Sequence, residues 1–154
     1  MGDASTLAET IRGVPARVAS AVAGANDDAL RRRPARGEWS PIEVVGHLAD
    51  KFEIWLARAA AVVATVGGTI DPYDQDAVVR DRGHQGADVG ALLDKVRASC
   101  DAFADAIATW NEAALAHTAF HPEYGMITAR ECIELPLASV HDHLRQIEEA
   151  LGAA

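Results

Sequence analysis

The sequence contains little cysteine and no segment that looks like an export signal. Its 154 residues include two cysteines, Cys100 and Cys132. Small secreted domains that depend on disulfides carry more, whereas reduced thiols are normal in the cytoplasm. The N-terminus lacks the basic stretch and following apolar run of a signal peptide. We therefore expect a cytoplasmic protein with two free thiols.

An excess of basic residues and a long hydrophobic run are also absent. Lysine and arginine number 14 against 23 aspartates and glutamates, which gives a formal net charge of −9. Nucleic-acid binding needs a basic surface, so we expect no nucleic-acid partner. The most apolar stretch, ARAAAVVATVGG, is too short to span a bilayer, so we expect no membrane partner.

Strand signals are scarce, and aromatic residues make up only 5% of the chain. Hydrophobic residues still reach 49%, enough for a substantial core, and alanine-rich stretches with helical spacing dominate. No internal repeat or low-complexity linker divides the sequence. These features predict an all-α protein with a single domain over residues 1–154.

The first helix is predicted from the stretch TLAE, in which Thr6 and Glu9 have the spacing of a capping box. We expect it to run to about residue 23, with a kink or early break at Gly13-Val14-Pro15. A turn follows, with a short helical piece near residues 28–32. The third long helix is predicted at about residues 88–110.

The second and fourth helices also begin at capping boxes. Ser40 and Glu43 enclose Pro41, which suits the first helical turn, and this helix should continue to Gly67-Gly68. Thr128 and Glu131 begin the last helix. The connections at residues 67–86 and 111–127 are too long for tight hairpins between helices. We therefore predict a four-helix bundle with long crossover connections.

Histidines on the helices are the main candidates for a functional site. In LASVHDHLRQIEEAL, residues 137–151, His141 and His143 are two residues apart. Helical metal ligands share a face at spacings of three or four, whereas a spacing of two turns them roughly 200° apart. On the second helix, His47 lies beside the apolar stripe. These two helices therefore offer His47 and His143, but not a complete metal site.

Three blocks, GEWSPIEVVGHLAD, HPEYGMITARE and HDHLRQIEEAL, resemble the DinB-like superfamily of bacterial four-helix proteins. The resemblance extends from about Trp39 to Leu151. It implies a bundle that holds a divalent metal, commonly nickel or zinc, through three histidines. Two of them map to His47 and His143. The third maps to Ser139, whose neutral hydroxyl is a poor ligand for a transition metal.

Three outcomes remain open for such a site. It is empty, or another group supplies the missing ligand, or Pro136 distorts the last helix and brings His141 into the site. The candidates for a replacement ligand are Asp50, Glu43, His121, His84 and a water held by Ser139.

The resemblance implies a metal-dependent enzyme of the hydrolase type, or a transferase that uses a low-molecular-weight thiol, with unknown substrate and catalytic residues. The partner would be a small molecule, and a homodimer is expected. The alternative is a small-ligand-binding or stress-related bundle without catalysis that has lost its metal. Retained metal would favour the enzyme.

Overall fold

The computed structural model describes residues 3–152. Its elements in chain order are α1 (Ala4–Val22), α2 (Asp27–Arg31), α3 (Pro41–Ala64), α4 (Gln75–Asp81), the 3₁₀ helix η1 (His84–Gly86), α5 (Val89–Ile107), α6 (Glu112–Leu115), β1 (Thr118–His121), β2 (Gly125–Thr128), α7 (Ala129–Ala138) and α8 (Val140–Gly152). Within residues 3–152, no helix is both long and apolar enough to cross a membrane.

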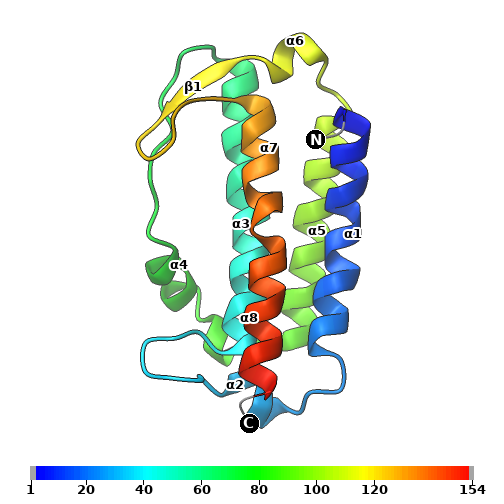
Figure 1. The fold of residues 1–154 in the computed structure, drawn as a ribbon, viewed down its shortest axis with the longest axis vertical. Helices are drawn as coiled ribbons and strands as arrows, with labels where there is room; N and C mark the ends of the chain where they lie inside the picture. Colours follow the sequence, from blue (N-terminus) through cyan, green and yellow to red (C-terminus); the bar gives the residue numbers. More distant parts are fainter. Residues whose placement is uncertain (1–2, 153–154) are drawn as a thin grey trace.

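The predicted all-α four-helix bundle is confirmed (Figure 1). Its four columns are α1, α3, α5 and the pair α7–α8. Figure 1 shows α3 and α5 running in the same direction, antiparallel to α1 and to α7–α8. The connection from α3 to α5 therefore crosses the whole length of the bundle, and α4 and η1 lie along it. This is the long crossover that the sequence predicted.

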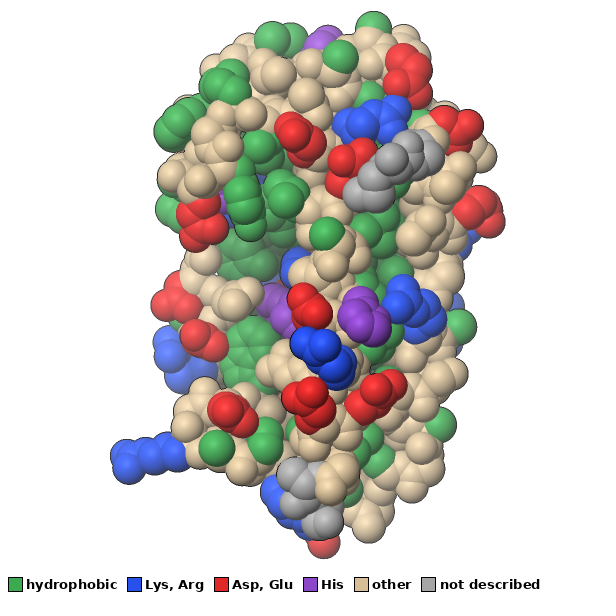
Figure 2. All heavy atoms as spheres, viewed as in Figure 1, with side chains coloured by type: hydrophobic (Ala, Val, Ile, Leu, Met, Phe, Trp, Pro, Cys, Tyr) green, Lys and Arg blue, Asp and Glu red, His purple; other side chains and the backbone are tan. Residues whose placement is uncertain are grey.

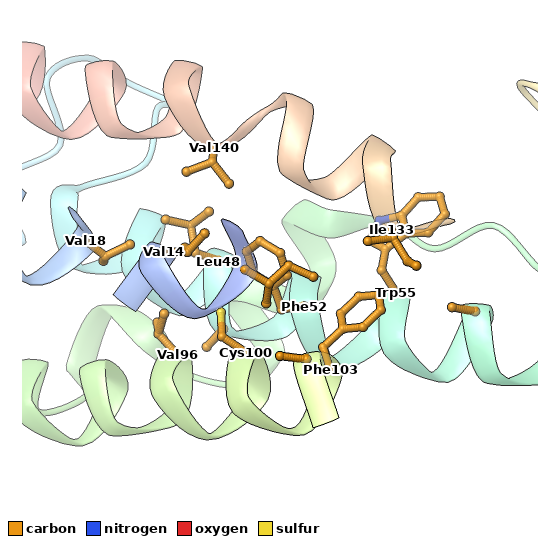
Figure 3. Close-up of a cluster of buried hydrophobic side chains, with 14 of the residues drawn as sticks. Val14, Val18, Leu48, Phe52, Trp55, Val96, Cys100, Phe103, Ile133 and Val140 are labelled. Atoms are coloured by element: carbon orange, nitrogen blue, oxygen red, sulfur yellow. The ribbon is translucent and has the colours of Figure 1, made fainter. Parts of the chain in front are cut away.

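The core lies where the apolar faces of these columns meet (Figure 3). Phe52 of α3 and Phe103 of α5 are fully buried, with their ring centroids 6.5 Å apart in an edge-to-face arrangement. Burying one such side chain contributes roughly 1.5–3 kcal/mol. The helical spacing of the sequence predicts an apolar stripe on α3, and its buried members are Val45, Leu48, Phe52, Trp55, Ala59 and Val62. The last predicted member, Val66, lies beyond the end of the helix and is 62% exposed.

The start and the course of α1 differ from the sequence prediction. Asp3, not Thr6, caps α1, and its side chain accepts a hydrogen bond from the Thr6 backbone N–H. The helix then continues through Pro15 without the expected break. The capping boxes of α3, at Ser40 and Glu43, and of α7 are confirmed.

The connection before α7, which the sequence predicts to be irregular, contains one short pair of strands. There, β1 and β2 form an antiparallel hairpin that pairs Thr118 with Thr128. The segment after α3 joins the hairpin edge, because Phe120 N–H donates to Gly68 O at 2.9 Å and Ile70 N–H donates to Phe120 O at 2.8 Å. The hairpin closes one end of the bundle beside α3 and α7.

The predicted fourth helix is two helices, because regular helix ends at Ala138 and resumes at Val140. Figure 3 shows this interruption beside Val140. Pro136 lacks the N–H that a regular helix would use, and Ser139 follows one turn later. The last column of the bundle is therefore interrupted at Ser139, the position to which the resemblance assigns a third histidine.

Candidate functional site

A lysine on α3 faces the interruption between α7 and α8. The Lys51 ammonium nitrogen Nζ donates a hydrogen bond to Ser139 Oγ and lies 3.5 Å from Nε2 of His143. The Ser139 hydroxyl also donates to the Pro136 carbonyl oxygen at 3.2 Å. The other ring nitrogen of His143, Nδ1, lies 3.2 Å from Oε1 of Gln146. A neutral His143 that donates from Nδ1 and accepts at Nε2 satisfies both contacts.

His47 completes the group, one turn before Lys51 on α3. Its side chain is buried, with its ring centroid 4.7 Å from that of His143 and 4.7 Å from that of Trp39. Nε2 of His47 is buried and has no hydrogen-bond partner within residues 3–152. Buried polar atoms normally have a partner, so this nitrogen is an exception in the structure.

Burial determines the charges in this cluster. It lowers the pKa of His47 to about 3, with smaller contributions from nearby His143 and Lys51. The pKa of His143 is lowered by burial and then by the Lys51 charge. Burial lowers the pKa of Lys51 to about 8, so the ammonium form still predominates at neutral pH. The cluster is therefore one cation among two neutral imidazoles and a hydroxyl.

Lys51 and Ser139 also line a cleft of about 440 Å³ between α3, the crossover, the hairpin and α7. Figure 2 shows the hollow, with blue and purple side-chain atoms visible inside it. Its lining further comprises Trp55, Arg58, Pro72, Tyr73, Asp74, Gln75, His121, Glu123, Tyr124 and Leu135. A small molecule in this cleft would lie against the Lys51 ammonium.

Arg58 supplies a second positive charge in the cleft and is held in place by three contacts. Its guanidinium carbon lies 4.5 Å from the ring centroid of Trp55 and 5.1 Å from that of Tyr73. One guanidinium nitrogen donates to the Asp71 carbonyl oxygen at 2.6 Å. Cation–π contacts of this kind orient a guanidinium while leaving other N–H groups available.

Of the candidate replacement ligands, Asp50 and His84 bind each other instead. Nε2 of His84 lies 2.7 Å from Oδ2 of Asp50, and both side chains are buried. The other oxygen of Asp50 accepts from Arg82 Nη1 at 2.7 Å. Glu43 accepts from Arg33 Nε at 2.8 Å. These carboxylates therefore anchor the crossover and the α2–α3 turn.

The two remaining histidine candidates lie apart from the pair formed by His47 and His143. His121 stacks on Trp55, with ring centroids 5.9 Å apart, and its Nδ1 accepts the Glu123 backbone N–H at 3.0 Å. It borders the cleft but contacts neither ring of the pair. His141 is exposed on α8, in a separate groove shared with α1. The interruption of the last helix therefore does not bring His141 into the cluster.

The residues as arranged do not fit a divalent metal. The unpartnered Nε2 of His47 and the accepting Nε2 of His143 are suitable donors, but Ser139 is a weak one and a cationic nitrogen lies among them. Within residues 3–152, no three His, Cys, Asp or Glu side chains are grouped closely enough to hold a metal ion. That His47 and His143 are metal ligands stays a prediction.

Lys51 and Arg58 are the residues that sequence reasoning missed. It searched for side chains that donate lone pairs to a metal, and a lysine ammonium cannot do so. A usable signal was present, because Lys51 follows His47 by four residues and so shares its helix face. The same spacing relates Ser139 to His143.

The chain is similar to known proteins over most of its length. The sequence profile of the DinB superfamily matches residues 10–147. "Putative metal-dependent hydrolase GK0616" of Geobacillus kaustophilus (strain HTA426) is 33% identical over 72 residues, which are 47% of this chain. The match covers 40% of that relative, less than half of its length.

A solved structure supports the fold over nearly the whole chain. It is YfiT from Bacillus subtilis, described as a probable metal-dependent hydrolase with an unusual four-helix bundle topology. The TM-score is 0.87 at 22% identity, with 97% of this chain and 87% of YfiT covered. At that identity the likeness is evidence for a common fold alone.

Proposed function

Because this chain belongs to the DinB superfamily, we propose that it is an enzyme that binds a small substrate in the cleft and hydrolyses it beside Lys51. The position of the Lys51 ammonium at the cleft, held by Ser139 and His143, carries the proposal. Two similar proteins are named a putative and a probable metal-dependent hydrolase, and these names suggest the reaction class.

The geometry suits a substrate with a carbonyl or anionic oxygen. A fixed ammonium at a partly enclosed site stabilises negative charge that develops on such an oxygen. Arg58 offers a second donor for an acidic group of the same molecule, and Trp55 and Tyr73 present aromatic surface to it. Removing one such charge-stabilising donor typically costs ~10²–10³ in kcat.

The test is hydrolysis of p-nitrophenyl acetate, followed as release of nitrophenolate in the presence of EDTA. Lys51→Met should lower the rate by at least ~10² and leave the fold intact. Lys95→Met is the matched control, because Lys95 is exposed on α5, away from the cleft, and should retain the wild-type rate. Activity that EDTA abolishes and Lys51→Met spares would refute the role given to Lys51.

A second candidate function is ligand binding without catalysis. It is favoured by the hydrogen bonds of Lys51, which engage both Ser139 Oγ and His143 Nε2 and leave neither free as a nucleophile or base. A thiolate, from the low-molecular-weight thiol that the family resemblance implies, would be a suitable anion for Lys51 and Arg58. Calorimetric binding of N-acetylcysteine that Lys51→Met weakens, with no hydrolysis of the ester, would select this function.

A further inference from the structure

We infer that the Lys51 ammonium takes the position of a metal ion between α3 and the last helix, and that removing it opens a latent metal site at His47, position 139 and His143. Two pairs of residues meet there. His47 and Lys51 are four apart on α3, and Ser139 and His143 are four apart across the interruption. Residues at this spacing share a face, so each helix presents two groups to the other.

Three of these four side chains carry atoms that donate lone pairs, and the fourth is the cation. Ser139 Oγ and His143 Nε2 both accept from Lys51 Nζ. The ring of His47 lies 4.7 Å from that of His143, and its Nε2 has no partner within residues 3–152. An ammonium and a divalent metal compete for the same lone pairs, and they repel each other at contact distance.

Position 139 is where a third strong ligand would enter. The Ser139 hydroxyl already reaches Lys51 Nζ, so an imidazole at 139 would extend into the space that the ammonium occupies. Neutral imidazole binds nickel and zinc, whereas a neutral hydroxyl does so poorly. The lysine on α3 and the serine at 139 therefore act together: one fills the site with positive charge, and the other provides an acceptor for that charge.

The experiment removes the ammonium and adds a third imidazole with the double substitution Lys51→Ala and Ser139→His. The tag-free variant is dialysed against Ni²⁺ or Zn²⁺. Elemental analysis should find about one metal ion per chain in this variant, as three histidines with an open position permit. Wild-type protein and the single Ser139→His variant should hold far less than one. A second readout is the visible absorption of Co²⁺, which reports tetrahedral coordination without any substrate.

Two further variants locate the ion. Adding His143→Ala to the double variant should abolish binding, whereas adding His141→Ala should not, because His141 lies in the groove against α1. Circular dichroism and thermal unfolding check that each variant folds. Wild-type protein that binds one metal ion per chain would overturn the inference, as would a folded double variant that binds none.

If the double variant does not fold, the single variant Lys51→Ala tests the inference. It should bind Ni²⁺ more tightly than wild type through His47 and His143, and the gain should vanish when His47→Ala is added. A folded Lys51→Ala variant with unchanged Ni²⁺ affinity would refute the inference. Since no substrate is involved, this result is independent of whether the cleft hydrolyses esters.

Discussion

Replacing Gly46 by alanine provides a sharp test of the packing that positions the crossover. Gly46 lies within α3, next to His47, and the ring of His84 from η1 packs directly against it. A Cβ atom at position 46 would lie 2.7 Å from Nδ1 of His84 and closer still to two ring carbons. The ring would have to move, although its Nε2 is held 2.7 Å from Asp50.

Opposing effects determine how much Gly46→Ala changes the free energy of unfolding. Helix propensity favours alanine over glycine by about 1 kcal/mol in a helix interior. Overpacking costs roughly 1–3 kcal/mol, and a buried acceptor left without its hydrogen bond costs roughly another 1–3 kcal/mol. The steric and hydrogen-bond costs together exceed the propensity gain. We expect Gly46→Ala to lower the free energy of unfolding by about 1–5 kcal/mol.

Gly13→Ala is the matched control, because Gly13 is exposed within α1 and a Cβ there would meet nothing within 4 Å. At this position the helix propensity of alanine acts without any steric cost. The Gly13→Ala variant should therefore be more stable than wild type by up to about 1 kcal/mol. Urea unfolding followed by circular dichroism measures both changes. If Gly46→Ala were as stable as wild type, the packing of His84 on α3 would be refuted.

Further predictions concern an ion pair, the thiols and a buried carboxylate. Burial raises the pKa of Glu43, but hydrogen bonds from Arg33 and Ser40 outweigh it and leave the pKa lowered. The ionised form therefore stabilises the fold above the unfolded-state value of about 4.3. In urea unfolding at a series of pH values, the advantage over Glu43→Gln should begin to shrink as the pH falls below that value and should be gone once the pH is below the lowered folded-state pKa; an advantage that does not shrink with falling pH would contradict the pairing. Burial raises the pKa of Cys100 to about 12 and that of Cys132 to about 11, so neither should react with a disulfide reagent at pH 8 until the protein unfolds. Asp50→Asn should cost roughly 1.5–3 kcal/mol of stability by denaturation, because it weakens two hydrogen bonds to a charged acceptor.

Helix positions were largely predictable because their signals are local. The capping boxes at the starts of α3 and α7 depend on residues three apart, and they formed as predicted. The hairpin was missed because its two strands are only four residues long, and the further partner of β1, the segment after α3, is distant in the sequence. Strands this short do not produce an alternation of apolar and polar residues long enough to be recognised in the sequence.

The candidate site was predictable only in part. Its two histidines, His47 and His143, were identified, and the structure brings their rings together. Asp50 and Glu43 were reasonable candidates by their place on α3, but each has a partner on another element. Whether an acidic side chain faces a site or a distant arginine depends on packing that spacing along one helix does not describe.

The sequence by itself determined that the chain is helical, which helix faces are buried and that position 139 carries no strong metal ligand, because period and residue chemistry are local properties. Only the tertiary structure decided what meets Ser139 and His143. The partner is Lys51, 88 residues before Ser139. That contact depends on the rotation and axial offset of α3 against the interrupted last helix, which no segment of the sequence specifies alone.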